Sequence, residues 1–135
     1  MVESIKNNKP EEMPSLALAY MGDAVYELAI REFLLAQGFT KVNQLHREAV
    51  KYVRAGAQAK ALFALENNLS EQEMAVVRRG RNAKSGTSPK GSDIVEYRHA
   101  TALEALIGYL YLKGEEDRVR EIIGFAIEVI RRADQ

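Results

Sequence analysis

Apolar residues recur at helical spacing along almost the whole chain, and no stretch alternates for long between apolar and polar positions. This periodicity predicts helices and no sheet. The expected helices span about 15–37, 44–54, 57–68, 71–84, 95–113 and 115–133. We therefore expect an all-α fold in which residues 1–13 form an N-terminal tail and residues 14–135 form one domain, large enough for a real core.

Residues that begin, cap or interrupt helices stand between these apolar segments. The expected signals are Pro14 with Ser15 at the first start, Asn43 as a cap, Gly56 as a break, and two capping boxes, Ser70 with Glu73 and Asp93 with Glu96. In the third expected helix, the residues predicted to face the core are Ala59, Leu62, Phe63 and Leu65.

The first expected helix contains the stretch LALAYMGDAVYELAI, residues 16–30, in which Asp23 and Glu27 are the only acids. A helix that is apolar on nearly every side usually lies inside a protein. We therefore expect Asp23 to be buried. An ionised carboxylate there is costly unless a cation, a metal or several hydrogen-bond donors meet it.

The fifth expected helix repeats this arrangement. Across residues 100–112, ATALEALIGYLYL, Glu104 is the only acid and Thr101 the only other strongly polar residue. We expect two such helices to pack on each other, with Ala100 and Gly108, each one turn from Glu104, permitting close approach. The sequence thus predicts that Asp23 and Glu104 come together.

Two interpretations of these acids remain open. In the first, each carboxylate pairs with an arginine or lysine, or caps a neighbouring helix. In the second, two isolated carboxylates repel each other and share a divalent cation. Oxygen ligands without cysteine or paired histidine favour Mg²⁺ or Mn²⁺ over zinc. Glu27, one turn from Asp23 on the same face, is placed to help hold the metal or to orient one of its ligands.

The composition excludes several other classes of protein. The chain has no cysteine, which excludes disulfides, thiol catalysis and cysteine-ligated metal sites and fits a cytoplasmic protein. The first 14 residues are polar and mixed in charge, unlike a signal peptide. Charged residues also interrupt the most apolar segment before it reaches membrane-spanning length, so we expect no membrane partner. With 19 basic and 19 acidic residues the net charge is zero, so total charge does not indicate a nucleic-acid partner.

The distribution of charge along the chain, unlike the net charge, does indicate a nucleic-acid partner. Residues 74–92 contain no acidic residue, and they carry five cations among glycine, asparagine, serine and threonine. Such side chains and backbone N–H groups bind phosphates well. An ordinary solvated loop is the alternative. The residues that we expect to contact RNA are Arg78, Arg79, Arg81, Lys84, Ser85, Thr87 and Lys90.

Three segments taken together resemble a known enzyme family. LAYMGDAVYEL resembles the ribonuclease III signature, roughly LEFLGDAVLEL, and ALEALIGYLYL resembles its second acidic segment, roughly DxFEALIGALYLD. With RGRNAKSGTSPK between them, nearly the whole chain resembles mini-ribonuclease III, the short bacterial form that has the catalytic domain and no double-stranded RNA-binding domain.

The resemblance implies a homodimeric, all-helical endonuclease that cuts double-stranded RNA with Mg²⁺, for which Mn²⁺ can substitute, and leaves 5′-phosphate and 3′-hydroxyl ends. For the mini form it implies maturation of the precursor of large-subunit (23S) ribosomal RNA. Matched by motif position, Asp23 and Glu104 correspond to catalytic metal ligands, and Tyr20 corresponds to an aromatic residue that packs across the dimer.

Two positions depart from the family pattern. Ala19 and Thr101 stand where the family has carboxylates, which leaves about half of its usual four and predicts weaker metal binding. Thr101 is then expected to orient neighbouring groups rather than to bind the metal. Two rivals to the enzyme remain: a non-catalytic, duplex-RNA-binding helical dimer with the same fold, and a dimerisation scaffold whose acids are neutralised by arginine. The retained Asp23 and Glu104 favour the enzyme.

Overall fold

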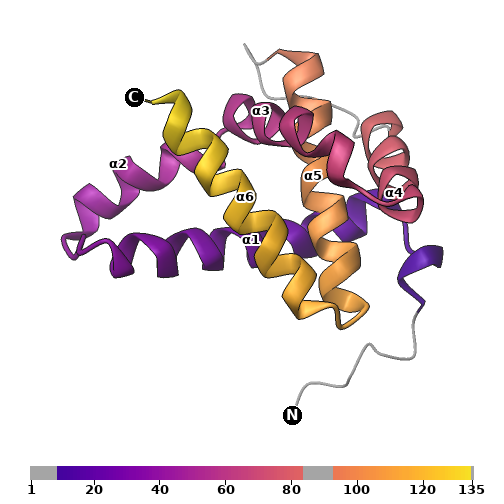
Figure 1. Cartoon of the computed structure of the whole chain (residues 1–135), viewed down its shortest axis with the longest axis horizontal. Helices are drawn as coiled ribbons and strands as arrows, with labels where there is room; N and C mark the ends of the chain where they lie inside the picture. Colours follow the sequence, from indigo (N-terminus) through magenta and orange to yellow (C-terminus); the bar gives the residue numbers. More distant parts are fainter. Residues whose placement is uncertain (1–8, 84–92, 135) are drawn as a thin grey trace.

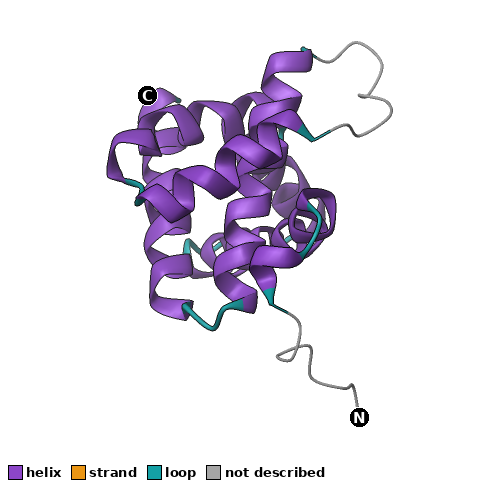
Figure 2. Ribbon diagram, turned by 90° about the vertical axis from the view of Figure 1, so that its right-hand side faces the viewer, coloured by secondary structure: helices purple, strands orange, loops and turns teal. Residues whose placement is uncertain are grey.

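The computed structural model describes residues 9–83 and 93–134, and all regular structure in these ranges is helical (Figure 2). Two short 3₁₀ helices are present, η1 (Pro10–Glu12) and η2 (Glu66–Asn68). The α-helices of these ranges are α1 (Ser15–Ala36), α2 (Val42–Val53), α3 (Ala55–Leu65), α4 (Glu71–Asn82), α5 (Ile94–Leu112) and α6 (Glu116–Ala133). The all-α prediction is confirmed. Among the described helices, none is long and apolar enough to span a membrane.

The helix borders differ from the predicted ones at both ends of α2. This helix begins at Val42 with Lys41 at its N-cap, and no side chain caps it, so Asn43 is a residue of the first turn rather than the cap. Gly56 lies inside the first turn of α3. The break before α3 is instead at Arg54, whose backbone is extended with ψ of 151°.

Side chains cap α4 and α5 at the predicted residues, but only the first of the two predicted capping boxes is complete. Ser70 Oγ accepts a hydrogen bond from Glu73 N at 3.1 Å, and Ser70 N donates to Glu73 Oε1 at 2.9 Å, which completes a capping box. Asp93 Oδ1 accepts hydrogen bonds from Val95 N at 2.8 Å and from Glu96 N at 3.2 Å. The bonds to Asp93 fix the start of α5.

Helix α5 is the centre of the fold, because α1, α3, α4 and α6 all pack against it (Figure 1). From Ala100 to Leu110 every residue of α5 except Glu104 is buried. Burial of one leucine or isoleucine side chain contributes about 1.5–3 kcal/mol. A helix that is apolar on nearly all sides therefore forms the core, and Glu104 is the one charged residue of this stretch.

Helices α1 and α5 cross at backbone contact through two glycines. A Cβ added at Gly22 would lie 1.7 Å from the carbonyl oxygen of Glu104, and one added at Gly108 would lie 1.9 Å from the carbonyl oxygen of Leu18. Neither position has room for a side chain. The predicted close approach at Gly108 is confirmed, and Gly22 is its partner on α1. This crossing brings Asp23, the neighbour of Gly22, to Glu104.

Two surface contacts were not predicted from the sequence: one between the rings of Phe63 and His99, and one between η1 and α5. The predicted core position of Phe63 is wrong, because its side chain is 55% exposed and its ring lies over that of His99, with 4.4 Å between the centroids. Near the N-terminus, Pro10 is buried and Tyr109 Oη donates to Glu11 Oε1 at 3.4 Å. Helix η1 therefore packs on α5.

Candidate active site

The α1–α5 crossing holds the two carboxylates that the sequence singles out. Asp23 follows Gly22 on α1, and Glu104 faces it from α5. The two side chains are close enough for one carboxyl group to donate a hydrogen bond to the other. The structure thus brings Asp23 and Glu104 together. We call them the acid pair.

The electrostatics of the acid pair favour a bound cation. Burial, then the negative charge of Asp23 and the hydrogen bond between the two carboxyl groups, raise the pKa of Glu104 to about 8 from an ordinary value of 4.5. The amide of Gln58 donates a hydrogen bond to Glu104 and lowers this pKa in part. Two adjacent carboxylates remain unfavourable when both are ionised, unless a cation neutralises them.

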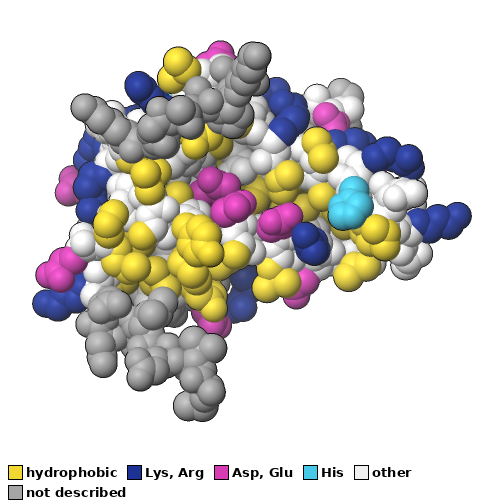
Figure 3. Space-filling model, turned by 180° about the vertical axis from the view of Figure 1, so that it is seen from behind, with side chains coloured by type: hydrophobic (Ala, Val, Ile, Leu, Met, Phe, Trp, Pro, Cys, Tyr) yellow, Lys and Arg dark blue, Asp and Glu magenta, His cyan; other side chains and the backbone are white. Residues whose placement is uncertain are grey.

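One side of the acid pair is open to solvent. Glu104 is partly buried but Asp23 is exposed, so the expected burial of Asp23 is wrong for the single chain. The reason is that no other helix within residues 9–83 and 93–134 covers this side of α1. Its exposed apolar residues, which we call the outer stripe, are Leu16, Tyr20, Ala24 and Leu28, with Leu16 41%, Tyr20 81% and Leu28 60% exposed. Figure 3 shows a face of the molecule on which acidic side chains lie among hydrophobic ones.

The buried side of the acid pair is lined by hydrogen-bonding groups from α1, α2 and α3. Tyr26 Oη donates to the carbonyl of Tyr52 at 2.7 Å. Burial, followed by the charge of Glu104, raises the pKa of Tyr26. Gln58 Nε2 donates to the carbonyl of Val53 at 2.9 Å and to Glu104 Oε2 at 3.4 Å. Gln58 is missing from the sequence predictions, although a lone amide in the alanine-rich stretch AGAQAKALFAL was a signal that could have revealed it.

The donor set of the acid pair suits a small, hard divalent cation. Asp23 and Glu104 offer carboxylate oxygens, the ligands that Mg²⁺ and Mn²⁺ prefer. Within 9–83 and 93–134, no lysine or arginine forms an ion pair with either of them. The same ranges contain no group of three or more potential metal-binding side chains. An ion held here by one chain would keep several waters, as Mg²⁺ commonly does.

Glu27 and Thr101, the two residues expected to support the acid pair, have other hydrogen-bond partners. Glu27 Oε1 accepts a hydrogen bond from Arg31 Nη2 at 3.3 Å, one turn further along α1. Thr101 Oγ1 donates to the carbonyl of Tyr97 at 3.0 Å, within its own helix. The hydrogen bonds that the structure shows for these side chains thus do not reach the acid pair.

The expected RNA-binding residues lie only partly within the described chain. Arg78, Arg79 and Arg81 occupy the last turns of α4, whereas Lys84, Ser85, Thr87 and Lys90 fall outside the described residues. Arg81 pairs with Glu66 at 3.5 Å, and Arg79 Nη1 donates to the carbonyl of Glu11 at 3.2 Å.

Arg78 and Arg79 share a groove with the outer stripe of α1. This groove has a volume of about 790 Å³, and Leu16, the first residue of the stripe, lines it together with the two arginines. The cations at the end of α4 therefore border the start of the outer stripe.

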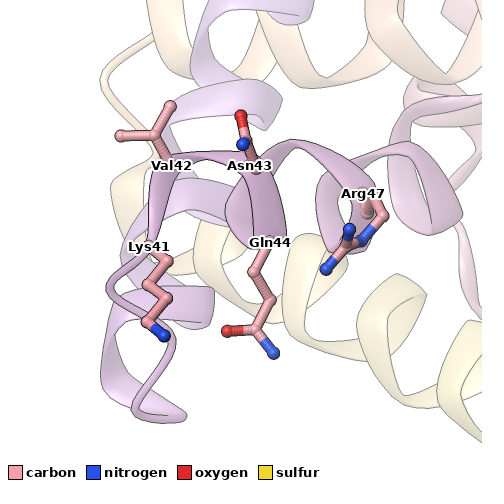
Figure 4. Close-up of a pocket in the computed structure, with 5 residues that line it drawn as sticks. All are labelled: Lys41, Val42, Asn43, Gln44 and Arg47. Atoms are coloured by element: carbon pink, nitrogen blue, oxygen red, sulfur yellow. The ribbon is translucent and has the colours of Figure 1, made fainter.

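A second open pocket, of about 490 Å³, lies at the start of α2. Lys41, Gln44 and Arg47 point to one side there, and Val42 and Asn43 point to the other (Figure 4). No carboxylate is among these five lining residues, so the pocket does not include the acid pair.

Comparison with known proteins gives the same family at the level of sequence and of structure. A family model described as the ribonuclease III domain matches residues 16–115. The protein named Mini-ribonuclease 3 from Brevibacillus brevis is 55% identical over 115 residues, which cover 85% of this chain and 86% of that protein. Mini-ribonuclease 3 from Symbiobacterium thermophilum is 51% identical over 123 residues, 91% of this chain and 95% of that protein.

A solved structure supports the same relationship. The crystal structure of a Fusobacterium nucleatum protein matches with a TM-score of 0.78 and 33% sequence identity, covering 87% of this chain and 93% of that one. Ribonuclease III enzymes act on double-stranded RNA, depend in general on divalent metal ions, and are typically dimeric. The matched range 16–115 includes both members of the acid pair. The chain therefore belongs to the ribonuclease III family and is a hydrolytic endoribonuclease.

Proposed function

We propose that this chain is a magnesium-dependent endoribonuclease that cleaves double-stranded RNA as a homodimer, with Asp23 and Glu104 as its metal ligands. Its substrate is the precursor of large-subunit (23S) ribosomal RNA, which places the reaction in the cytoplasm. The products carry 5′-phosphate and 3′-hydroxyl ends. One observation carries the proposal: two carboxylates meet at the α1–α5 crossing with no cation of the described chain to neutralise them.

Each member of the acid pair has a distinct part in this proposal. Glu104 is partly buried and held by Gln58, so it forms the fixed inner ligand. Asp23 is exposed, so it forms the outer ligand on the side from which a phosphodiester can approach. Glu104 must release its proton before it binds a cation, because its pKa is raised to about 8. Bound Mg²⁺ supplies a Lewis acid that stabilises the negative charge developing at the phosphate and lowers the pKa of water.

The number of carboxylates predicts a weak metal site. Ala19 is buried one turn before Asp23 on α1, and the hydroxyl of Thr101 is bonded within α5, so neither position adds a carboxylate. Mg²⁺ tolerates this because it retains water ligands. We therefore expect Mg²⁺ to bind more weakly than in a site with four carboxylates.

The outer stripe of α1 supports the proposed homodimer. An isolated chain rarely leaves such a contiguous row of large apolar side chains in water. A second copy of the chain suits this surface, because dimerisation is typical of the family and Tyr20, the expected interface residue, is the most exposed of the large side chains in the stripe. Two copies joined here would place two acid pairs on one assembly, so that each could cut one RNA strand.

The end of α4 supports binding of the RNA backbone. An RNA duplex hides the base edges of its major groove in a deep, narrow groove, so proteins recognise it mainly through phosphates, 2′-hydroxyls and shape. Arg78 and Arg79 are exposed beside the groove that leads to the outer stripe. In the proposal Arg81, Lys84, Ser85, Thr87 and Lys90 extend this contact.

The test is cleavage of a labelled RNA duplex and of a 23S precursor transcript, each with and without Mg²⁺. Cleavage should need the metal and should be lost in Asp23→Asn and in Glu104→Gln, with circular dichroism spectra unchanged. Glu128→Gln is the matched control, because Glu128 is a surface carboxylate of α6 that pairs with Arg132 at 3.2 Å; this variant should cut normally.

Three results would count against the proposal. Undiminished cutting by Asp23→Asn would refute the roles given to the acid pair. Binding of duplex RNA without cleavage in either Mg²⁺ or Mn²⁺ would favour a non-catalytic binding protein. Equal rates on the 23S precursor and on an arbitrary duplex would remove the ribosomal precursor as the preferred substrate.

A further inference from the structure

Gln58 on α3 is buried although its side chain is polar. It is 2% exposed, and its neighbours Ala57, Ala59 and Ala61 are buried as well. Removing an amide from water is costly unless its polar atoms find hydrogen-bond partners. The partners of this amide therefore indicate why it is there.

The end of α2 sets the direction in which the Gln58 amide points. Val53 is the last residue of α2, and its backbone carbonyl can only accept a hydrogen bond. The NH₂ end of Gln58 must face this carbonyl, and it donates to it at 2.9 Å. The remaining N–H is then directed to Glu104 Oε2, at 3.4 Å.

The opposite end of the same amide is unsatisfied. Gln58 Oε1 is buried and has no hydrogen-bond partner among the described residues. A buried acceptor without a partner lowers stability, and an apolar side chain of the same length would avoid this cost. The amide is thus a poor choice for packing alone, and the contact that justifies it is the one with Glu104.

The end of α2, whose Val53 carbonyl holds the Gln58 amide, is itself held in place. The carbonyl of Tyr52, next to that of Val53, accepts a hydrogen bond at 2.7 Å from the fully buried Tyr26. Tyr26 lies on α1, one turn from Asp23. The end of α2 is therefore fixed to the helix that carries Asp23, and through Gln58 to the side chain of Glu104.

We propose that Gln58 is a positioning residue for the acid pair: its amide ties the Glu104 carboxylate to the end of α2 and so holds it where it and Asp23 bind the divalent cation together. This inference rests on the proposed function. Neighbours that orient a metal-binding side chain commonly contribute tenfold or more to metal affinity. Loss of the amide should therefore weaken metal binding about tenfold while the fold persists.

The experiment measures Mn²⁺ binding to the full chain by electron paramagnetic resonance, without RNA. Gln58→Met keeps the length of the side chain and removes both the donor and the unsatisfied acceptor, so it should bind Mn²⁺ about tenfold more weakly and melt close to the wild type. Gln58→Asn keeps an amide but shortens its reach, and it should show the same loss. Leu62→Met, one turn along α3 at a fully buried position, perturbs packing alone and should bind Mn²⁺ as the wild type does.

The outcomes separate this inference from the proposed function. Wild-type affinity in both Gln58 variants, with binding lost in Glu104→Gln, would overturn the role of Gln58 and leave the metal site standing. Equal losses in Gln58→Met and Leu62→Met would also overturn it, because packing would then explain the effect. No Mn²⁺ binding by the wild type, or full binding by Asp23→Asn, would overturn both. If Gln58→Met does not fold, Gln58→Asn decides.

Discussion

An alanine at Gly22 should disrupt the α1–α5 crossing and the acid pair together. Its Cβ would lie 1.7 Å from the carbonyl oxygen of Glu104 and 2.6 Å from the carbonyl carbon. Ordinary van der Waals contact begins at about 3.4 Å, so the two helices would have to separate locally by roughly 1.7 Å. The obstructing atoms belong to the backbone, which cannot turn aside as a side chain can.

The expected loss of stability follows from that displacement. Overpacking a well-packed core commonly costs about 1–3 kcal/mol, and a backbone obstruction places Gly22→Ala at the upper end, about 3 kcal/mol. In a domain of this size such a loss lowers the melting temperature by roughly 10 °C. Because the displaced atoms belong to Glu104, the affinity of the acid pair for Mn²⁺ should fall as well.

Gly124→Ala is the matched control for this substitution. Gly124 lies in α6, is exposed, and has nothing within 4 Å of an added Cβ. The same change there should stabilise the helix by up to about 1 kcal/mol. Differential scanning calorimetry should show shifts of opposite sign for the two variants. A melting temperature of Gly22→Ala at or above that of the wild type would refute the backbone contact.

Three further predictions concern pH, RNA and assembly. The pKa of Glu104 is raised from 4.5 to about 8, so its contribution to stability is complete below about pH 4.5 and is lost as the pH rises through 8. The melting temperature of the metal-free wild type should therefore fall relative to that of Glu104→Gln between about pH 5 and 9. Parallel dependences of the two melting temperatures on pH would contradict this. Reversing Arg78 and Arg79 to glutamate should weaken duplex-RNA binding and flatten its salt dependence in fluorescence anisotropy, whereas unchanged affinity would exclude α4 from the interface. Tyr20→Ala should convert a dimer to a monomer in light scattering with little change in secondary structure, because Tyr20 is 81% exposed in one chain; a variant that keeps the dimer mass would remove Tyr20 from the interface.

Much of the fold follows from local sequence signals. The periodic apolar residues and the caps at Ser70 and Asp93 predict the α4 and α5 starts that the structure shows. The start of α2 could not be predicted in this way, because Lys41 caps it without a side-chain hydrogen bond. The meeting of Asp23 and Glu104 could be predicted, since each is an isolated acid in a helix that must pack against another.

The surroundings of the acid pair depend on tertiary structure and were harder to predict. A helix that is apolar on all sides indicates burial, but it does not say whether the same chain or a second copy provides the cover. For this reason the predicted burial of Asp23 is wrong for the single chain, whereas Tyr20, which is predicted to lie at the dimer interface, is exposed in it. The lone amide in an alanine-rich stretch marks Gln58, but its contact with Glu104 joins residues 46 positions apart, so no local pattern reveals that partner.

The central claim is that Asp23 and Glu104 together hold one divalent cation. Anomalous X-ray diffraction from crystals soaked in Mn²⁺ tests it most directly, because it locates the ion itself rather than its effect on cleavage. The account predicts an anomalous peak at the α1–α5 crossing with an oxygen of each carboxylate bound to it, and no such peak in Asp23→Asn crystals. A peak bound elsewhere, or one that persists at the crossing in Asp23→Asn, would contradict it.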